Sequence, residues 1–364
     1  MNKTSLIRRT VLASALLAAS GFAAAQTVKM TLGHGAAPGN PRHTASLLFA
    51  DVLKAKTNGR IEVTVSPSAQ LGTDPALITA VRSGAVDMTA NSQGAMANVV
   101  PEYNAFGMPF LFADLAAAWK VMDGPVGKEL AKITEDKGMV VLGYWDNGIR
   151  HMSNSKRPLN TPEDMKGLKM RTPPDAVTVD IMKAVGASAQ QIAFSELYVA
   201  LQQGVVDGQE NPLMNIDSAK LYEVNKYVSL TGHKYEMTPF VMSKRTWDKL
   251  GDADKKAVME AAGEATQLQR KLSQESDAKL INDLKAKGAI INTANKAAFE
   301  MKERILRFLK ELSLGVMKEE ERSELLAPLN MSPEEAAGTG PLFFPHWRGK
   351  VRGAGSGAGP PGPR

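Results

Sequence analysis

The stretch A-L-Q-Q-G-V-V-D, Ala200 to Asp207, decides the fold class of this 364-residue chain, because Ala80 to Asp87 reads A-V-R-S-G-A-V-D on the same skeleton. Each copy ends an apolar helical face at a glycine, Gly84 or Gly204, and glycine tolerates the left-handed backbone that helix ends commonly adopt. A short apolar strand follows in each copy. The repeat predicts two α/β halves of similar construction, and a cleft between domains is a favoured place for a small ligand.

The first part of the chain alternates between expected strands and helices. Val28 to His34 and Arg60 to Ser66 have the pattern of strands, and His43 to Lys56 has apolar residues at helical spacing. Asp74 and Pro75 suit the first turn of the helix in the first repeat. This order favours parallel strands linked by helices, so we expect an α/β fold with mixed, mainly parallel sheets flanked by helices.

The alternation continues to the end of the second repeat. The expected helices are Leu115 to Met122, Val126 to Glu135, Asp175 to Val185 and Glu196 to Gln203, and the expected strands are Met139 to Tyr144, Leu168 to Arg171 and Tyr227 to Leu230. From Ala253 to Lys287 only Gly263 interrupts a run of strong helix formers. At about 1.5 Å per residue this helix is on the order of 50 Å long, which is enough to cross both domains.

Several motifs occur around the repeats in a fixed order. They are S-A-Q-L-G (68–72), G-I-R-H (148–151), G-L-K-M-R-T-P (167–173), D-G-Q-E-N-P (207–212) and L-T-G-H-K-Y (230–235). From about Val28 to about Asn295 the chain resembles the extracytoplasmic solute receptors of tripartite ATP-independent periplasmic (TRAP) transporters, the family of dicarboxylate-binding periplasmic proteins. The resemblance implies a two-domain periplasmic-binding-protein fold in which a long helix bridges both domains.

The resemblance also implies where the domains begin and end. Domain I is expected to comprise residues 26–148 and 238–275, and domain II residues 149–237 and 276–338. The chain stops resembling the family after about Phe299. Residues 339–364 end in G-A-G-S-G-A-G-P-P-G-P-R, which has no face to bury, so we expect a disordered tail outside the family.

The N-terminus has the three regions of a secretory signal peptide. Three basic side chains occur in the first ten residues, the apolar run 11–19 follows, and Ala23-Ala24-Ala25 provides small residues for cleavage before Gln26. The apolar run is too short to span a membrane. We expect residues 1–25 to be removed and the mature protein to reside in the periplasm. Arg8-Arg9 also fits a loose twin-arginine pattern, so the export route stays open.

Composition excludes several classes of function. The chain has no cysteine, which excludes disulfides, thiol nucleophiles and thiolate metal sites. Much of the net charge of +6 lies in the signal peptide and in an acid-free tail, so the remaining body is near neutral and has no cationic face for nucleic acid. The five histidines are scattered, so we expect no metal and no cofactor.

The ligand-binding chemistry is expected to come from arginines. A guanidinium group offers paired donors that match a carboxylate in a bidentate fork. Arg171 follows an apolar strand and precedes Thr172-Pro173, and the resemblance places the family's principal carboxylate-binding arginine there. The alternative from spacing alone is an exposed arginine, or one paired with a nearby aspartate.

Two further residues support this site. Arg150 leaves the expected strand past a glycine turn at the domain crossing; its alternative role is an interdomain salt bridge. Asn211 precedes Pro212, which holds the preceding backbone extended and so directs the amide, and the resemblance implies a ligand contact there. Its alternative role is that of a turn residue.

Other polar and aromatic residues are weaker candidates. Those of the first domain follow expected strands, and those of the crossing suit a hydroxylated acid. They are His34, Asn91 and Gln93 from the first domain, Tyr144, Asp146 and Asn147 at the crossing, where Trp145 is equally suited to the core, and Phe194 and Tyr235 beside the cleft.

We therefore expect a monomeric periplasmic solute-binding protein. It captures a small organic acid, which is a sugar acid, a uronate or a dicarboxylate, through an arginine–carboxylate salt bridge, and delivers it to the membrane permease of a TRAP transporter. One alternative is a secreted lyase or hydrolase of sugar acids that uses Asp146, Glu196, Glu210 and His34. The chain has no G-x-S-x-G, H-E-x-x-H or P-loop motif to support it. The other alternative is a binding module that serves a sensor.

Overall fold

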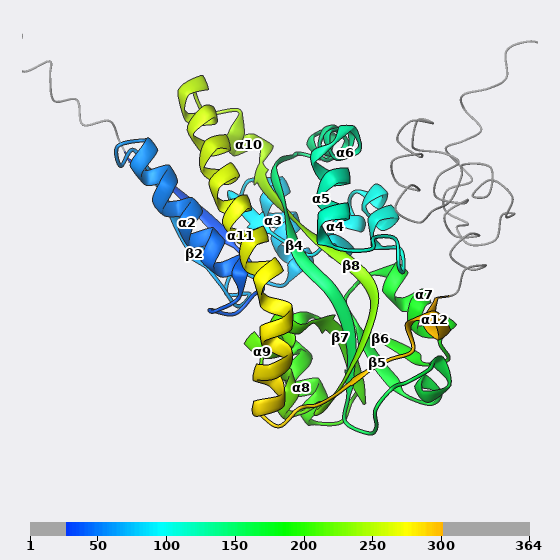
Figure 1. The fold of residues 1–364 in the computed structure, drawn as a ribbon. Coiled ribbons are helices and arrows are strands. Elements are labelled where there is room, and N and C mark those ends of the chain that lie inside the picture. Colours follow the sequence, from blue (N-terminus) through cyan, green and yellow to red (C-terminus); the bar gives the residue numbers. More distant parts are fainter. Residues whose placement is uncertain (1–26, 301–364) are drawn as a thin grey trace, which may run out of the picture.

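Two lobes of α/β structure are joined by two long strands in the computed structural model, which describes residues 27–300. The expected signal peptide and the glycine-rich tail therefore lie outside the described residues. The joining strands, β4 (Met139–Asn154) and β8 (Tyr227–Ser243), pair antiparallel along their length. Figure 1 shows both running from one lobe into the other. Because each strand belongs to both lobes, the space between the lobes is built on continuous backbone.

Each lobe adds parallel strands to this central pair. In the first lobe β1 (Val28–Gly33) pairs parallel with β2 (Ile61–Ser66) and with β3 (Met88–Ala90), which pairs with β8. In the second lobe β5 pairs parallel with β6 and β7, β7 pairs with β4, and β9 pairs parallel with β8; these strands are β5 (Lys169–Thr172), β6 (Ser188–Gln191), β7 (Gly208–Pro212) and β9 (Ile290–Thr293). The expected two-domain α/β fold with a mixed sheet is confirmed.

Helices cover the sheet in both lobes (Figure 1). The first lobe carries α2 (Pro41–Lys56), α3 (Asp74–Ser83), α4 (Gln93–Ala97), α5 (Leu115–Asp123) and α6 (Pro125–Asp136), and the second carries α7 (Ala176–Ala184), α8 (Leu197–Gln202), α9 (Leu213–Ser218) and α12 (Lys296–Phe299). The short α10 (Lys244–Trp247) follows β8. No helix of the described residues is both long and apolar enough to cross a membrane.

The sequence repeat forms the same structure in both lobes. The helices α3 and α8 are followed by glycines with positive φ, 80° at Gly84 and 69° at Gly204. The aspartate that ends each copy then binds the backbone of the neighbouring parallel strand: Asp87 accepts from Thr31 N at 2.8 Å, and Asp207 accepts from Lys169 N at 2.9 Å. Each copy therefore fixes its own strand next to another strand of the same lobe.

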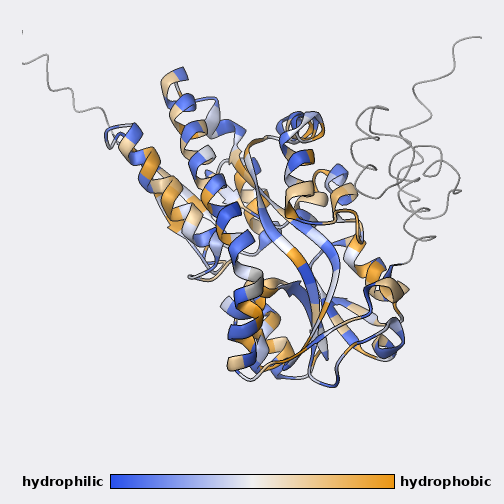
Figure 2. Ribbon diagram, viewed as in Figure 1, coloured by the Kyte–Doolittle hydropathy of each residue, from blue (hydrophilic) through white to orange (hydrophobic). Residues whose placement is uncertain are grey.

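The expected long helix is confirmed as α11 (Asp252–Ala286), which runs past both lobes in Figure 1. Most of its length is hydrophilic in Figure 2. Its buried face near the first lobe is rich in alanine, which lets α11 lie close to α2 and β4. Gln269 of α11 accepts from Asp146 N and donates to Asp146 O, both at 2.8 Å, while Arg270 donates to Tyr144 O. The helix thus holds β4 where the strand passes between the lobes.

The strands of the crossing differ from the sequence predictions. The expected strands 139–144 and 227–230 are only the beginnings of β4 and β8. Gly148 forms no turn, because its φ of 114° accommodates an irregularity inside β4, where the register with β8 shifts between Asp146 and Gly148. The prediction that Arg150 leaves a strand past a glycine turn is therefore wrong, and Arg150 belongs to a continuous strand. The predicted domain boundaries fall inside β4, β8 and α11 and stay a prediction.

Candidate functional site

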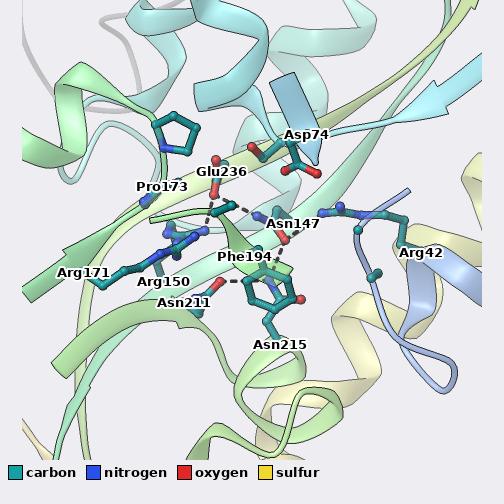
Figure 3. A pocket seen from close by; sticks show the side chains of 15 residues that line it. Arg42, Asp74, Asn147, Arg150, Arg171, Pro173, Phe194, Asn211, Asn215 and Glu236 are labelled. Atoms are coloured by element: carbon teal, nitrogen blue, oxygen red, sulfur yellow. Dashed lines mark hydrogen bonds and ion pairs between the residues drawn. The ribbon is translucent and has the colours of Figure 1, made fainter. Parts of the chain in front are cut away.

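A polar pocket lies between the two lobes, and Figure 3 shows its side chains from close by. Its cavity volume is about 40 Å³. The first lobe and the crossing strands contribute Gly35, Ala36, Arg42, Asp74, Ser92, Asn147, Arg150 and Glu236, and the second lobe contributes Arg171, Pro173, Pro174, Ala193, Phe194, Asn211 and Asn215.

Arg171 lies on β5, and its two terminal nitrogens, Nη1 and Nη2, form no hydrogen bond within the described residues. The side chain is 2% exposed, and its only hydrogen bond within residues 27–300 runs from Nε to Ile192 O at 2.9 Å. In the same range it forms no ion pair. The ring of Phe194 lies 5.9 Å from the guanidinium carbon and supports the group. Burial lowers the pKa of Arg171 to about 10, so the group stays charged at neutral pH.

Arg150, in contrast, is saturated by internal partners. Nε and Nη2 both bind the carboxylate of Glu210, Nη2 also binds Glu210 O at 2.6 Å, and Nη1 binds Glu236. All three side chains are almost completely buried. Burial alone disfavours the charge of Arg150, but the two carboxylates more than offset this effect and raise its pKa. Arg150 therefore lies in a buried ion cluster at the wall of the pocket, but its partners Glu210 and Glu236 belong to the same expected domain II, so this cluster is not the interdomain salt bridge of the alternative.

Arg42, at the start of α2, is a second buried arginine that forms no ion pair within the described residues. Its Nη2 donates to Asn147 Oδ1 at 3.0 Å and to Thr238 Oγ1 at 2.9 Å. Its Nε is buried without a partner. Burial lowers the pKa of Arg42, and the charges of Asp74 and Glu236 act in the opposite direction. In Figure 3 Arg42 and Arg171 enter from opposite sides of the pocket.

Three amides connect these charged groups. Asn215 donates to Asn147 Oδ1 and to Asn211 Oδ1, each at 3.0 Å, and Asn147 donates to Glu236 at 2.8 Å. Asn40 of the first lobe donates to Asn215 Oδ1 at 2.9 Å, so the chain of amides links the two lobes. Because an amide both donates and accepts, this row suits a ligand with several hydroxyl groups.

Carboxylates balance the positive charge around the pocket. Glu236 and Asp74 line it, and Glu210 lies behind it against Arg150. Burial raises the pKa of Asp74, while the charge of Arg42 lowers it. Counted with Arg42, Arg150 and Arg171, the three carboxylates make the site neutral when all six groups are ionised. A monoanionic ligand thus adds a single negative charge.

The structure brings five of the predicted site residues together at this pocket: Arg171, Arg150, Asn211, Asn147 and Phe194. From the first domain, His34, Asn91 and Gln93 are buried but do not line it. Asn91 donates to Asp74 O and Gln93 donates to Tyr103 O, which fixes the surrounding loops. His34 contacts His43, and burial lowers the pKa of His34 to about 3, so its ring is neutral.

Three predicted residues of the crossing also have internal partners rather than a place in the pocket. Tyr144 donates to Gly127 O at 2.8 Å, and the hydroxyl of Tyr235 donates to Asp146 at 2.8 Å. Asp146 in addition accepts from Trp119. These side chains attach the crossing strands to the first lobe. Trp145 is fully buried and belongs to the core.

Sequence reasoning missed several residues that line the pocket, chiefly Arg42, Asp74, Asn215 and Glu236. Asp74 was interpreted only as a helix-starting residue. Asn215 stands four residues after Asn211, but Asn211 lies on β7 and Asn215 on α9, so no single-element spacing marks the pair in the sequence. Arg42 follows Asn40-Pro41, a helix start, but nothing in the sequence marks its side chain as buried. Within residues 27–300 no group of three or more potential ligands could hold a metal ion.

Comparison with known proteins gives a consistent result. The model of the family "bacterial extracellular solute-binding protein, family 7" matches residues 32–312. The match passes Phe299, so the expectation that the resemblance ends there is wrong. The uncharacterized protein y4mM of Sinorhizobium fredii (strain NBRC 101917 / NGR234) is 55% identical over 286 residues, which cover 77% of this chain and 53% of that protein. The chain thus spans about half the length of this relative.

Two characterised proteins are also similar. The 2,3-diketo-L-gulonate-binding periplasmic protein YiaO of Escherichia coli (strain K12) is 36% identical over 284 residues, which cover 78% of this chain and 87% of that protein. A crystal structure of a TRAP periplasmic solute binding protein from Polaromonas sp JS666, bound to D-erythronate, has a TM-score of 0.78 and 37% identity, and the match covers 82% of this chain and 98% of that one. Both relatives bind acids that carry hydroxyl or keto groups.

Proposed function

The chain belongs to family 7 of the bacterial extracellular solute-binding proteins, and we propose that it captures a sugar acid through an ion pair between Arg171 and the carboxylate of the ligand. The family consists of solute-binding receptors, and its TRAP members are periplasmic. The observation that carries the proposal is the state of Arg171. It is buried, it points into the pocket, and it keeps Nη1 and Nη2 free of internal acids within the described residues.

The chemistry of a guanidinium group explains this choice. Nη1 and Nη2 form the end-on fork that matches the two oxygens of a carboxylate, and such charge-assisted bonds are roughly twice as strong as neutral ones. Among the three arginines at the pocket, only Arg171 has this fork available. We assign Arg150 the role of holding Glu210 and Glu236 in place, and Asn211 that of binding the ligand beside Arg171.

Capture is proposed to close the two lobes. The pocket takes Arg42 and Asp74 from the first lobe and Arg171 and Asn211 from the second, so a ligand that touches all four favours the shut arrangement over an open one. The hydrogen bond between Asn40 and Asn215 adds a direct link between the lobes.

The pocket gives no support to the enzyme alternative. Its proposed acid–base groups were Asp146, Glu196, Glu210 and His34, and none of them lines the pocket. Asp146 and Glu210 are engaged in internal bonds, and His34 is held neutral. We therefore assign the chain to binding rather than catalysis, without a cofactor.

A matched set of four-carbon ligands tests the proposal. We expect D-erythronate, at about 100 times its dissociation constant, to stabilise the purified protein by about 2.7 kcal/mol, which raises Tm by several degrees. Erythritol has the same carbon skeleton without the carboxylate and is expected to give no shift. Differential scanning fluorimetry measures both. An equal shift with erythritol, or chemical conversion of the bound acid, contradicts the proposal.

Delivery to a TRAP permease completes the proposed function and has its own test. We expect uptake of labelled D-erythronate into proteoliposomes that contain the organism's TRAP permease to require addition of this protein. Uptake at the same rate without it contradicts delivery. Binding without any stimulation of uptake favours the alternative of a module that serves a sensor. The expected monomeric state stays a prediction.

A further inference from the structure

Arg42 is fixed in the pocket by the start of its own helix. The side chain of Asn40 accepts from Arg42 N at 3.0 Å and so caps α2. The guanidinium group then lies buried at the wall opposite Arg171, with only 6% of the residue exposed (Figure 3). This position allows Arg42 to contact the end of a ligand whose carboxylate is bound by Arg171.

The hydrogen bonds of Arg42 leave it unable to grip a carboxylate. A guanidinium group can offer a carboxylate two forks, Nη1 with Nη2 and Nε with Nη2, and both need Nη2. Nη2 has two hydrogens, and they are directed to Asn147 and Thr238. What remains is single donation from Nη1 or from the unpartnered Nε. Arg42 therefore differs from Arg171, in which only Nε donates a hydrogen bond to a described residue.

Asp74 lines the same pocket as Arg42 (Figure 3). The charge of Asp74 acts to raise the pKa of Arg42, and the charge of Arg42 acts to lower the pKa of Asp74, in each case against the effect of burial. A hydroxyl group donates one hydrogen bond and accepts others, so it matches a cationic donor next to a carboxylate acceptor. A second carboxylate at this place has no proton to give to Asp74 and is repelled by it.

We propose that Arg42 and Asp74 form a subsite for a hydroxyl group, so that the pocket selects hydroxylated monocarboxylates over dicarboxylates of the same length. This inference rests on the proposed function, because it assumes that Arg171 holds the first carboxylate. It makes Arg42 a residue that determines specificity, at the end of the ligand opposite the carboxylate.

Two matched triples of acids test the inference by isothermal titration calorimetry. Each triple keeps one carboxylate and carries a terminal hydroxymethyl, methyl or carboxylate group: D-erythronate, its 4-deoxy analogue and meso-tartrate, and D-galactonate, D-fuconate and galactarate. For the triple that fits the pocket, we expect the methyl and the dicarboxylate members to bind at least about tenfold more weakly than the hydroxymethyl member. Equal affinity of the dicarboxylate overturns the inference.

Variants separate a specificity role from a structural one. Arg42→Met is expected to lower the affinity for the hydroxymethyl acid about tenfold or more and to leave the affinity for the methyl analogue nearly unchanged. Asp74→Asn is expected to reduce the preference for the hydroxymethyl acid over the dicarboxylate. Arg82→Met, at an exposed position, is the control. If a variant at Arg42 or Asp74 loses the same factor of affinity for all three members of a triple, the inference is contradicted. If none of the six acids binds the folded protein, the proposed function fails and the inference fails with it.

Discussion

Replacement of Arg171 with methionine is expected to weaken the binding of sugar acids strongly while the protein stays folded. The variant removes the only guanidinium group at the pocket with a free end-on fork. Loss of one partner of a buried charge pair typically costs about 2–5 kcal/mol, which raises the dissociation constant by roughly 30- to 5,000-fold. Titration calorimetry with D-erythronate measures the effect.

The stability of the same variant provides the control. Arg171 forms no ion pair within the described residues, and burial lowers its pKa, so its charge works against folding when the pocket is empty. We expect ligand-free Arg171→Met to unfold at the same urea concentration as the parent protein, or at a higher one. Arg171→Lys keeps a charge without the fork and is expected to recover only part of the affinity. An unchanged dissociation constant for Arg171→Met removes this residue from the site.

Replacement of Arg150 with methionine is expected to have the opposite profile and to destabilise the protein by about 3–5 kcal/mol. Arg150 is the cation bound by both Glu210 and Glu236, and both carboxylates are fully buried. Its removal leaves Glu236 without its cation and leaves Glu210 with only His233, whose Nε2 lies 3.4 Å away and whose pKa is lowered by burial. For a chain of this size, Tm falls on the order of 10 °C. Urea unfolding of the ligand-free protein measures the loss.

A triple variant separates the effect of charge from that of packing. Arg150→Met combined with Glu210→Gln and Glu236→Gln removes all three charges and is expected to regain much of the lost stability, because replacement of a whole buried ion cluster is often nearly neutral. If Arg150→Met alone is as stable as the parent protein, the role given to Arg150 is contradicted. Comparison with Arg171→Met then shows which arginine serves the fold and which serves the ligand.

The fold was largely predictable because its signals are local and repeated. The two copies of the helix–glycine–strand unit, with glycines at Gly84 and Gly204, predicted two α/β halves, and the run of helix formers predicted α11. The continuity of β4 and β8 was not predictable. Positive φ at Gly148 has the same sequence signature in a turn and in a bulge, and only the pairing with the partner strand decides between them.

The position of a residue at the pocket was predictable chiefly where a motif combined with chemistry. The motif residues Arg150, Arg171 and Asn211 all line the pocket, as do Asn147 and Phe194 among the weaker candidates, and their contacts with a ligand stay predictions. The other candidates at strand ends were chosen for polarity, and polar side chains there also serve to satisfy the loop backbone, as Gln93 does for Tyr103. Arg42 was missed because its burial depends on the second lobe approaching the start of α2, which no local pattern encodes.

The unbroken passage of β4 and β8 through the waist of the molecule has a mechanical consequence. Two lobes joined by a flexible linker can move without changing the backbone of the binding site. Here any movement of the lobes has to bend the hydrogen-bonded pair of β4 and β8. Two of the three register shifts between these strands, at Asp146 to Gly148 and at Arg150 to Met152, lie next to the side chains of Asn147 and Arg150, which line the cavity. The segments that bend when the lobes move therefore also carry residues that line the cavity. The size of the ligand then determines how far the two lobes can approach each other.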